Sequence, residues 1–287
     1  MAKKTLDTRL HAFRSDIADI SLKNKVTAKK YITGKKYQMA RGITKLFRKP
    51  DQQAVTASQL LYGEYFNVFE IKEGWAWGQS LKDGYVGYCA VDCLTLDLHQ
   101  TTHHVSALST HIYPKPDLKS HPVDQLYMMS DVSVVDENQK DGFLPLADGN
   151  WIYATHIAKD YGVDPVSEAL KFLYTPYLWG GRSNAGIDCS GLIQIAFASI
   201  GIQISRDADL QELEIGITLD DNEVPIHGDL AFFPGHVGIM LDDMHLLHAN
   251  AHHMRVSIDP LHEVIDVVSF QTNKPPLTCI KRVSLCL

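Results

Sequence analysis

The sequence predicts a multidomain protein, with two small β-barrels followed by one α+β domain. The chain has 287 residues, more than the roughly 100–200 of a typical domain. Short β-type runs separated by turn residues fill residues 39–97, and a weaker copy of part of this pattern follows them. From Asp164 onward, helical periodicity and alternating strand patterns occur together, which indicates a domain of mixed structure.

The composition is that of a soluble globular protein. Hydrophobic residues make up 45% and charged residues 21% of the chain, and no apolar run approaches the ~18 residues that span a bilayer. We therefore expect no membrane partner. The first residues, Met-Ala-Lys-Lys-Thr-Leu-Asp, contain no apolar stretch of the kind found in secretory signals, so we expect a cytoplasmic protein. Five cysteines, an odd number in a long chain, predict at least one free thiol.

Positive charge is concentrated in the first fifty residues, which hold 14 Lys or Arg against 3 Asp. We assign residues 1–38 to a basic N-terminal segment. Its basic positions are spread among apolar ones and no nucleic-acid-binding motif accompanies them, so we expect a solvated face and no nucleic-acid partner.

The two barrels are predicted over residues 39–100 and 101–160. Residues 83–88, Asp-Gly-Tyr-Val-Gly-Tyr, match residues 148–153, Asp-Gly-Asn-Trp-Ile-Tyr, and each segment follows a strand pattern. Tandem copies of one small barrel are the simplest explanation. In this alignment Tyr88 has a counterpart in Tyr153, as a residue of the barrel core would, whereas Tyr85 corresponds to Asn150.

The third domain is predicted over residues 161–287. Asp164 and Pro165 form the start of a first helix. A second helix begins at Asp188 and Cys189, since apolar residues recur with helical spacing from Leu192 until Gly201 ends the pattern. An antiparallel meander follows over residues 229–233, 236–241 and 244–249, with turns at Pro-Gly and Asp-Asp.

Cys189 stands at the N-terminus of that second helix, between Asp188 and Ser190. The helix dipole and the free backbone N–H groups at this end favour a thiolate over a thiol. A buried structural cysteine is the commonest alternative, but such a residue rarely lies at a polar helix cap. We therefore predict that Cys189 is a nucleophile.

A cysteine nucleophile needs a base and a group that orients the base. His236 opens one strand of the predicted meander, and His248 lies on the next strand. Adjacent antiparallel strands bring such residues together. A single strand histidine is more often structural, so the prediction depends on both histidines and Cys189 acting together.

Several motifs resemble those of the NlpC family of papain-like cysteine peptidases, and they occur in order over residues 165–270. They are Tyr-Leu-Trp-Gly-Gly at 177–181, Asp-Cys-Ser-Gly-Leu at 188–192, Gly-Asp-Leu-Ala-Phe-Phe at 228–233, Gly-His-Val-Gly-Ile at 235–239 and Leu-His-Ala-Asn at 247–250. The barrels resemble the bacterial SH3-like domains that accompany cell-wall peptidases. The expected fold is thus two SH3-like β-barrels followed by an α+β papain-like cysteine peptidase domain.

The resemblance implies a role for each catalytic residue. Cys189 attacks the scissile carbonyl, His236 is the base and His248 orients it. Family members carry a tyrosine twelve residues before the nucleophile that points at the oxyanion, which selects Tyr177, and the backbone N–H of Cys189 is the second donor. Tyr177 as a mere wall of the cleft is the alternative.

The chain further resembles one subgroup of this family, in which SH3-like domains precede the catalytic domain. Its members are γ-D-glutamyl-L-diamino acid endopeptidases that require a free N-terminal L-alanine. The resemblance implies that Asp188 binds the substrate ammonium, that Ser190 assists, and that Tyr85 and Glu64 of the first barrel close the amine pocket. Helix capping is the competing role for Asp188.

Two further positions near the second helix bear on this subgroup. Ala208 stands where the subgroup is expected to have a serine, so affinity or preference for the diamino acid is expected to differ. Arg206 and Asp207, on the loop after this helix, are interpreted first as a structural pair, and a substrate clamp is the alternative.

The sequence therefore predicts an endopeptidase that acts on murein peptides in cell-wall peptide recycling, with no cofactor. Alternatives are a non-catalytic binder of wall fragments, a lytic wall endopeptidase and an acyl transferase. A zinc site is a further alternative, suggested by the cluster of His248, His252 and His253 together with Cys189, but a full set of four ligands at plausible spacing is missing. The sequence leaves open whether the diamino acid is lysine or diaminopimelate, what the basic segment contacts, and the oligomeric state.

Overall fold

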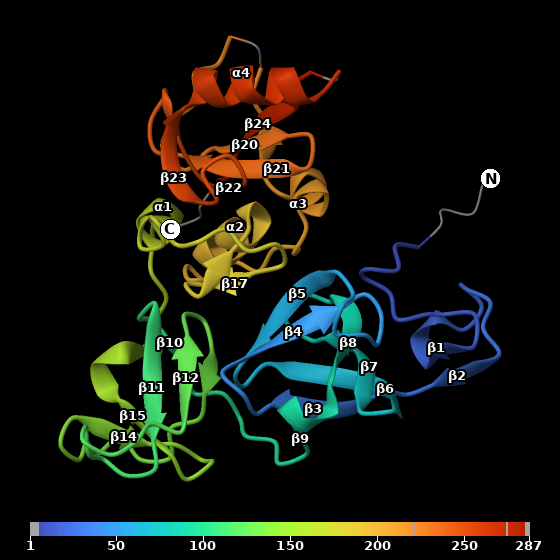
Figure 1. Ribbon diagram of the computed structural model, residues 1–287, viewed down its shortest axis with the longest axis vertical. Coiled ribbons are helices and arrows are strands. Elements are labelled where there is room, and N and C mark those ends of the chain that lie inside the picture. The colour runs from blue at the N-terminus through green and yellow to red at the C-terminus, as the bar shows by residue number, and fades with distance from the viewer. Residues whose placement is uncertain (1–5, 221, 274, 285–287) are drawn as a thin grey trace. The chain divides into compact units, whose positions relative to one another are not determined.

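The computed structural model (Figure 1) describes residues 6–220, 222–273 and 275–284. The chain divides into two compact units, residues 1–159 and 160–287. Most of the regular structure is strand. Within the described residues, no helix has the length and apolar character needed to cross a bilayer.

The basic N-terminal segment is folded against the first barrel. Its elements are β1 (Ile17–Asp19), the 3-10 turn η1 (Ile20–Leu22) and β2 (Lys30–Ile32), with β1 and β2 parallel. The Arg14 guanidinium lies 4.4 Å from the Trp77 ring centroid and donates to Glu70 at 2.7 Å. The lysines at 23, 25, 29, 30, 35 and 36 are exposed, as expected for a solvated face.

One seven-stranded antiparallel sheet forms the first barrel, in the order β5-β4-β8-β7-β6-β3-β9. Its strands are β3 (Lys35–Met39), β4 (Ile43–Phe47), β5 (Thr56–Leu61), β6 (Tyr65–Lys72), β7 (Trp75–Ser80), β8 (Val86–Ala90) and, after the 3-10 turn η2 (Val91–Cys93), β9 (Leu94–Thr95). The first barrel was expected to begin at residue 39, which is the last residue of β3. It begins earlier, at the start of β3, because this strand pairs with β6 and β9.

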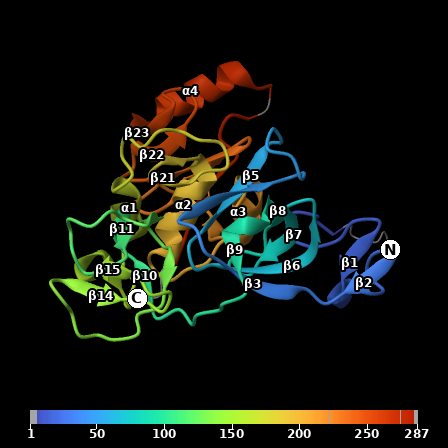
Figure 2. The ribbon, with the colours of Figure 1, turned by 60° about the horizontal axis from the view of Figure 1, so that its bottom comes forward.

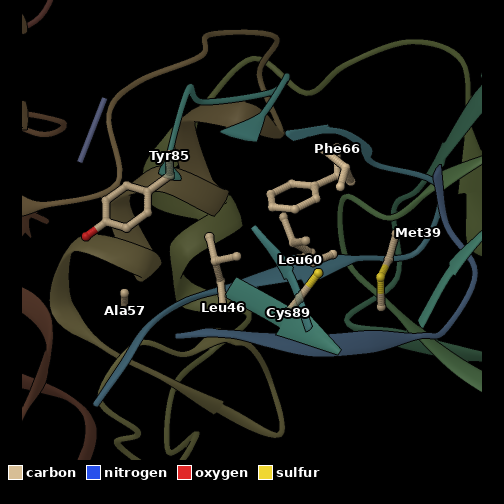
Figure 3. Packing of buried hydrophobic residues seen from close by; sticks show 9 residues of the cluster. Met39, Leu46, Ala57, Leu60, Phe66, Tyr85 and Cys89 are labelled. Carbon is tan, nitrogen blue, oxygen red and sulfur yellow. The ribbon is translucent and has the colours of Figure 1, made fainter. Parts of the chain in front are cut away.

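The core of this barrel is apolar and tightly packed (Figure 3). It includes Met39, Leu46, Leu60, Phe66 and Cys89, each at most 1% exposed. Position 87 requires glycine, because a Cβ there would clash with the Leu46 side chain at 2.6 Å.

Two small sheets form the second barrel, in the orders β13-β10-β16 and β12-β11-β15-β14. The strands are β10 (His103–Val105), β11 (Ser109–Tyr113), β12 (Asp124–Tyr127), β13 (Asp131–Val132), β14 (Phe143–Pro145), β15 (Trp151–Tyr153) and, after the 3-10 turn η3 (Ala154–His156), β16 (Ile157–Ala158). Both barrels therefore close with the same strand, 3-10 turn and short strand, in agreement with the repeat in the sequence.

Residues 160–287 form the α+β unit around a six-stranded antiparallel sheet in the order β19-β24-β20-β21-β22-β23. Its strands are β19 (Ile217–Thr218), β20 (Leu230–Phe233), β21 (His236–Met240), β22 (His245–Asn250), β23 (Arg255–Pro260) and β24 (Cys279–Arg282), and a separate pair is β17 (Arg182–Ser183) and β18 (Gly186–Ile187). The predicted meander corresponds to β20, β21 and β22.

Helices cover both faces of this sheet (Figures 1 and 2). They are α1 (Pro165–Leu170), α2 (Cys189–Ala198), α3 (Ala208–Glu214) and α4 (Leu261–Gln271). Helix α2 packs against β21 and β22. Helix α4 covers the opposite face, where Val264 joins Phe233, Met240 and Leu246 in one cluster. The start of α2 thereby comes beside the first residue of β21.

Candidate active site

Helix α2 begins at Cys189 because Asp188 caps it. Asp188 has extended backbone angles and its Oδ1 accepts the N–H of Gly191 at 2.8 Å. The same carboxylate accepts the N–H of Gly180 at 2.7 Å through Oδ2. The cap fixes the direction in which the first turn of α2, and with it Cys189, leaves the preceding loop. The predicted helix start is confirmed.

Asp188 is also the partner of a buried arginine. Arg206 is 1% exposed and donates to both carboxylate oxygens, at 2.9 Å from Nη1 to Oδ1 and 2.8 Å from Nη2 to Oδ2. Ser190 Oγ accepts from Arg206 Nη1 at 2.9 Å. Arg206 thus has a structural role, as expected, and its carboxylate partner here is Asp188.

These bonds bear on the ammonium-binding role predicted for Asp188. An ionised carboxylate offers about four lone-pair directions. Two backbone N–H groups and the two guanidinium nitrogens of Arg206 already occupy four. Helix capping is therefore the role that the contacts support. Ammonium binding by Asp188 stays a prediction, as does the assisting role of Ser190.

Cys189 is 7% exposed and its sulfur is held as a thiol. Burial, with a smaller effect from the Asp188 carboxylate, raises the pKa of Cys189 to about 12. The backbone N–H groups of Val237 and Ser190 and the charge of Arg206 act in the opposite direction. Desolvation of the charged form outweighs them. The expectation of a resting thiolate is therefore wrong, and attack needs a base.

His236 and His248 form a hydrogen-bonded pair. His236 Nε2 lies 2.8 Å from His248 Nδ1, and the ring centroids are 5.0 Å apart. His236 follows the Pro234-Gly235 turn, where Gly235 has a φ of 74°. Burial, and then the charge of His248, lower the pKa of His236 to about 3, so the ring is neutral at neutral pH and able to accept a proton.

Asp259 extends this pair of histidines to a row of three hydrogen-bonded side chains, and it was not predicted from the sequence. His248 Nε2 lies 2.9 Å from Asp259 Oδ2, and Ser257 Oγ donates to the same oxygen at 2.6 Å. Both Ser257 and Asp259 lie on β23, the neighbour of β22. Alternation in the segment 255–260 places positions 257 and 259 on one face, but the pairing of β23 with β22 could not be inferred from the sequence.

Tyr177 lies near the nucleophile. Its backbone N–H donates to Met254 O at 2.9 Å, and it forms an isolated bridge with Ile187 just before Asp188. Burial, followed by the charges of Cys189 and Asp188, raises the pKa of Tyr177. The hydroxyl is therefore protonated and able to donate a hydrogen bond at neutral pH.

Cys189, Tyr177, His236 and His248 all line one cleft of about 830 Å³ within residues 160–287. The cleft continues past Asp259 to Val264 of α4. The residues predicted for catalysis, far apart in the sequence, are thus brought to one site.

The residues predicted from the first barrel belong to the other unit, and Glu64 is engaged there. Its side chain is 0% exposed, and its Oε2 accepts the N–H of Leu61 at 3.0 Å. Lys82 Nζ lies 3.9 Å from Glu64 Oε1 and 3.2 Å from Asp131 Oδ1 of the second barrel. Glu64 therefore helps to join the two barrels, and these contacts lend no support to its predicted role in substrate binding.

Tyr85 and Tyr88 are arranged differently from the prediction. Tyr85 is 1% exposed and belongs to the barrel core, with its hydroxyl pointing away from the cluster (Figure 3) and accepting from Arg48 Nη2 at 3.2 Å. Tyr88 is half-buried and accepts from Arg14 Nη1 at 2.9 Å. The expectation that Tyr88 is the core residue is wrong, because alternation along β8 turns Cys89 inward and Tyr88 outward.

Ala208, in place of the expected serine, is the first residue of α3. No group of three or more His, Cys, Asp or Glu side chains in the described part of the chain is arranged to hold a metal ion. His253 instead contacts Asp259 Oδ1 at 3.2 Å. Cys286 lies outside the described residues.

Comparison with known proteins agrees with this geometry. Residues 174–268 match the NlpC/P60 family, and residues 46–94 match the bacterial dipeptidyl-peptidase Sh3 domain. The first of these ranges contains Tyr177, Cys189, both paired histidines and Asp259.

Two curated relatives show the extent of the similarity. The chain is 29% identical over 244 residues to dipeptidyl-peptidase 6 of Lysinibacillus sphaericus, covering 76% of this chain and 89% of the relative. It is 36% identical over 111 residues to a gamma-D-glutamyl-L-lysine dipeptidyl-peptidase of Bacillus subtilis, covering 36% of each.

A solved structure shares the fold. The crystal structure of an NlpC/P60 family protein from Bacillus cereus aligns with a TM-score of 0.71 at 19% identity, covering 87% of this chain and 99% of that one.

The fold, the site and these matches together define a peptidase of the cysteine class with a papain-like catalytic domain. More particularly, the chain carries an NlpC/P60 peptidase domain and a bacterial dipeptidyl-peptidase SH3 domain.

Proposed function

We propose that the protein is an endopeptidase that cleaves the bond between γ-D-glutamate and an L-diamino acid in murein-derived peptides with a free N-terminal L-alanine. The observation that carries the proposal is Cys189 at the N-terminus of α2, in one cleft with the hydrogen-bonded His236 and His248. The name of the Bacillus subtilis relative, gamma-D-glutamyl-L-lysine dipeptidyl-peptidase, supports the choice of bond.

The reaction starts from a neutral thiol and a neutral imidazole. As the Cys189 sulfur bonds to the scissile carbonyl carbon, its proton moves to His236. That proton then passes to the leaving amine when the carbon–nitrogen bond breaks, and a thioester of L-Ala-γ-D-Glu stays on Cys189. A water molecule, deprotonated by His236, releases the dipeptide and restores the thiol.

Tyr177 and the backbone N–H of Cys189 are the proposed donors to the oxyanion. The raised pKa of Tyr177 supports this role, because a phenol that holds its proton donates to developing negative charge. Each such donor contributes about 2.7–4 kcal/mol to the transition state in well-studied hydrolases.

Recognition of the free amine is the finer part of the proposal. Arg206 neutralises Asp188, so Asp188 contributes mainly by holding the start of α2. The amine contacts expected from the sequence, Asp188 with Ser190 and the Tyr85 hydroxyl, stay predictions that the experiment below tests. Cytoplasmic location and a role in peptide recycling stay predictions from the sequence.

The test compares L-Ala-γ-D-Glu-L-Lys, its diaminopimelate analogue, and the N-acetylated form of each. Acetylation removes the charge and adds bulk, and a lost charge-assisted contact of this kind costs about 2–5 kcal/mol, or tens to thousands of times in kcat/KM. The measurement is kcat/KM, with release of L-Ala-γ-D-Glu identified by mass spectrometry. Equal cleavage of free and acetylated peptides contradicts amine recognition and favours a lytic endopeptidase.

Two tyrosine variants sharpen this test. Tyr85→Phe should lower kcat/KM for the free peptides and leave the slow acetylated ones unchanged. Tyr88→Phe is the matched control, because its hydroxyl contacts Arg14. An equal loss in both variants would indicate a general effect on the barrel.

A further inference from the structure

Asp259 ends a continuous chain of hydrogen bonds that starts at the catalytic base. The links are His236 Nε2 to His248 Nδ1 at 2.8 Å and His248 Nε2 to Asp259 Oδ2 at 2.9 Å. Asp259 is further fixed by Ser257 Oγ at 2.6 Å and by His253 Nε2 at 3.2 Å from its other oxygen.

Strand register explains why these groups meet. In the antiparallel pair β22 and β23, His248 lies opposite Ser257, and Leu246 lies opposite Asp259. Positions 246 and 248 share one face of β22, and positions 257 and 259 share the same face of β23. Asp259 is therefore diagonal to His248, within reach of the ring nitrogen farther from the backbone.

The charge of Asp259 determines where the protons lie. The hydrogen bond from His248, aided by one from Ser257, holds the pKa of Asp259 well below its usual range despite partial burial. The ionised carboxylate only accepts hydrogen bonds, so Nε2 of His248 carries a proton. When His248 carries this proton alone, its Nδ1 accepts, and Nε2 of His236 donates to it. This leaves the lone pair of His236 on Nδ1.

We propose that Asp259 is a positioning residue for the peptidase reaction, which selects the tautomers of His248 and His236 so that Nδ1 of His236 can take the proton of Cys189. This role rests on the proposed function, with Cys189 as nucleophile. When His236 becomes an imidazolium during attack, it donates through Nε2 to a His248 that is itself held by a full negative charge. No atom of Asp259 touches the substrate in this account.

Asp259→Asn tests the role. The amide can offer an N–H where the carboxylate only accepts, which favours the opposite tautomer along the chain. We expect kcat on L-Ala-γ-D-Glu-L-Lys to fall by about 10–1,000-fold, less than the ~10⁴ lost when a carboxylate contacts the base directly. KM should stay within about twofold, because substrate contacts are unchanged.

Asp242→Asn is the matched control. Asp242, in the turn between β21 and β22, forms a similar Asp–His pair with its Oδ2 2.9 Å from His245 Nδ1, but both side chains are about half exposed. It removes the same charge and should leave kcat and KM unchanged. A kcat of Asp259→Asn within twofold of wild type overturns the proposal. So does a loss of kcat that coincides with unfolding at the assay temperature.

A readout without peptide substrate separates this proposal from the proposed function. The rate at which iodoacetamide alkylates Cys189, followed by mass spectrometry, should fall in His236→Ala and, to a smaller extent, in Asp259→Asn. Wild-type rates in Asp259→Asn alone overturn the positioning role and leave the Cys189–His236 pair intact. Wild-type rates in His236→Ala overturn the pair, and with it both proposals.

Discussion

Cys89 in the first barrel and Cys189 at the start of α2 are both buried cysteines, and their surroundings differ. Cys89 is 0% exposed in an apolar core with Met39 and Leu46 (Figure 3). Cys189 is 7% exposed and lines a cleft that also contains His236. Burial raises the pKa of both thiols. Acidity therefore does not distinguish them.

The difference lies in what surrounds each sulfur. At Cys189, N–H groups of Val237 and Ser190 point to the sulfur, and a neutral histidine with a lowered pKa lies in the same cleft. The apolar cluster around Cys89 contains no such base. A base and access to substrate, rather than a resting thiolate, make the nucleophile in this molecule.

The largest expected effects come from replacing Cys189 and Cys89, one at a time, with alanine. Cys189→Ala should lower kcat by at least about 10³-fold with little change in the free energy of unfolding, because the nucleophile is lost. Cys89→Ala should retain kcat and cost about 1–3 kcal/mol of stability, since it leaves a gap in a packed core. Turnover assays and urea denaturation measure both. Reversed effects would mean that the two sites have been assigned incorrectly.

Asp188→Ala should have the next largest effect, on stability. It leaves the guanidinium of Arg206 buried without its partner and removes the cap of α2, with an expected cost of about 3–5 kcal/mol. Asp242→Asn, on an exposed pair, should cost less than about 1 kcal/mol. Urea denaturation gives both values. Equal, small losses in the two variants would show that the buried pair does not hold the site.

The pH dependence of kcat/KM gives the smallest effect. The pKa of His236 is lowered, so the ring is neutral above that value and loses its function as a base only when pH falls through it. Activity should therefore persist below pH 6.5, the ordinary range of histidine. A profile that is already falling above pH 6.5 would contradict a buried, neutral base.

Local chemistry was predictable from the sequence. The cap at Asp188, the start of α2 at Cys189 and the two strands that carry His236 and His248 follow from short-range patterns, and the structure has all of them. The repeat between the barrels was also visible, because turn residues recur at matching positions.

Features that depend on tertiary packing were not predictable. Asp259 reaches His248 only through the register of β23 on β22, and Arg206 reaches Asp188 only because α3 returns beside α2. The positions of Tyr85 and Tyr88 were inverted, since alignment of a repeat does not show which side of a strand faces the core. The resting protonation of Cys189 was missed because helix-end effects are local, whereas desolvation depends on the whole fold.

The central claim is that Cys189 carries the acyl group, and an acid quench during turnover tests it most directly. Peptide mapping by mass spectrometry of the protein mixed with L-Ala-γ-D-Glu-L-Lys should find a thioester of L-Ala-γ-D-Glu on the peptide that contains Cys189. The same adduct should be absent from Cys189→Ala, which should also release no dipeptide. An adduct on another residue, or dipeptide released at the wild-type rate by Cys189→Ala, would contradict the account.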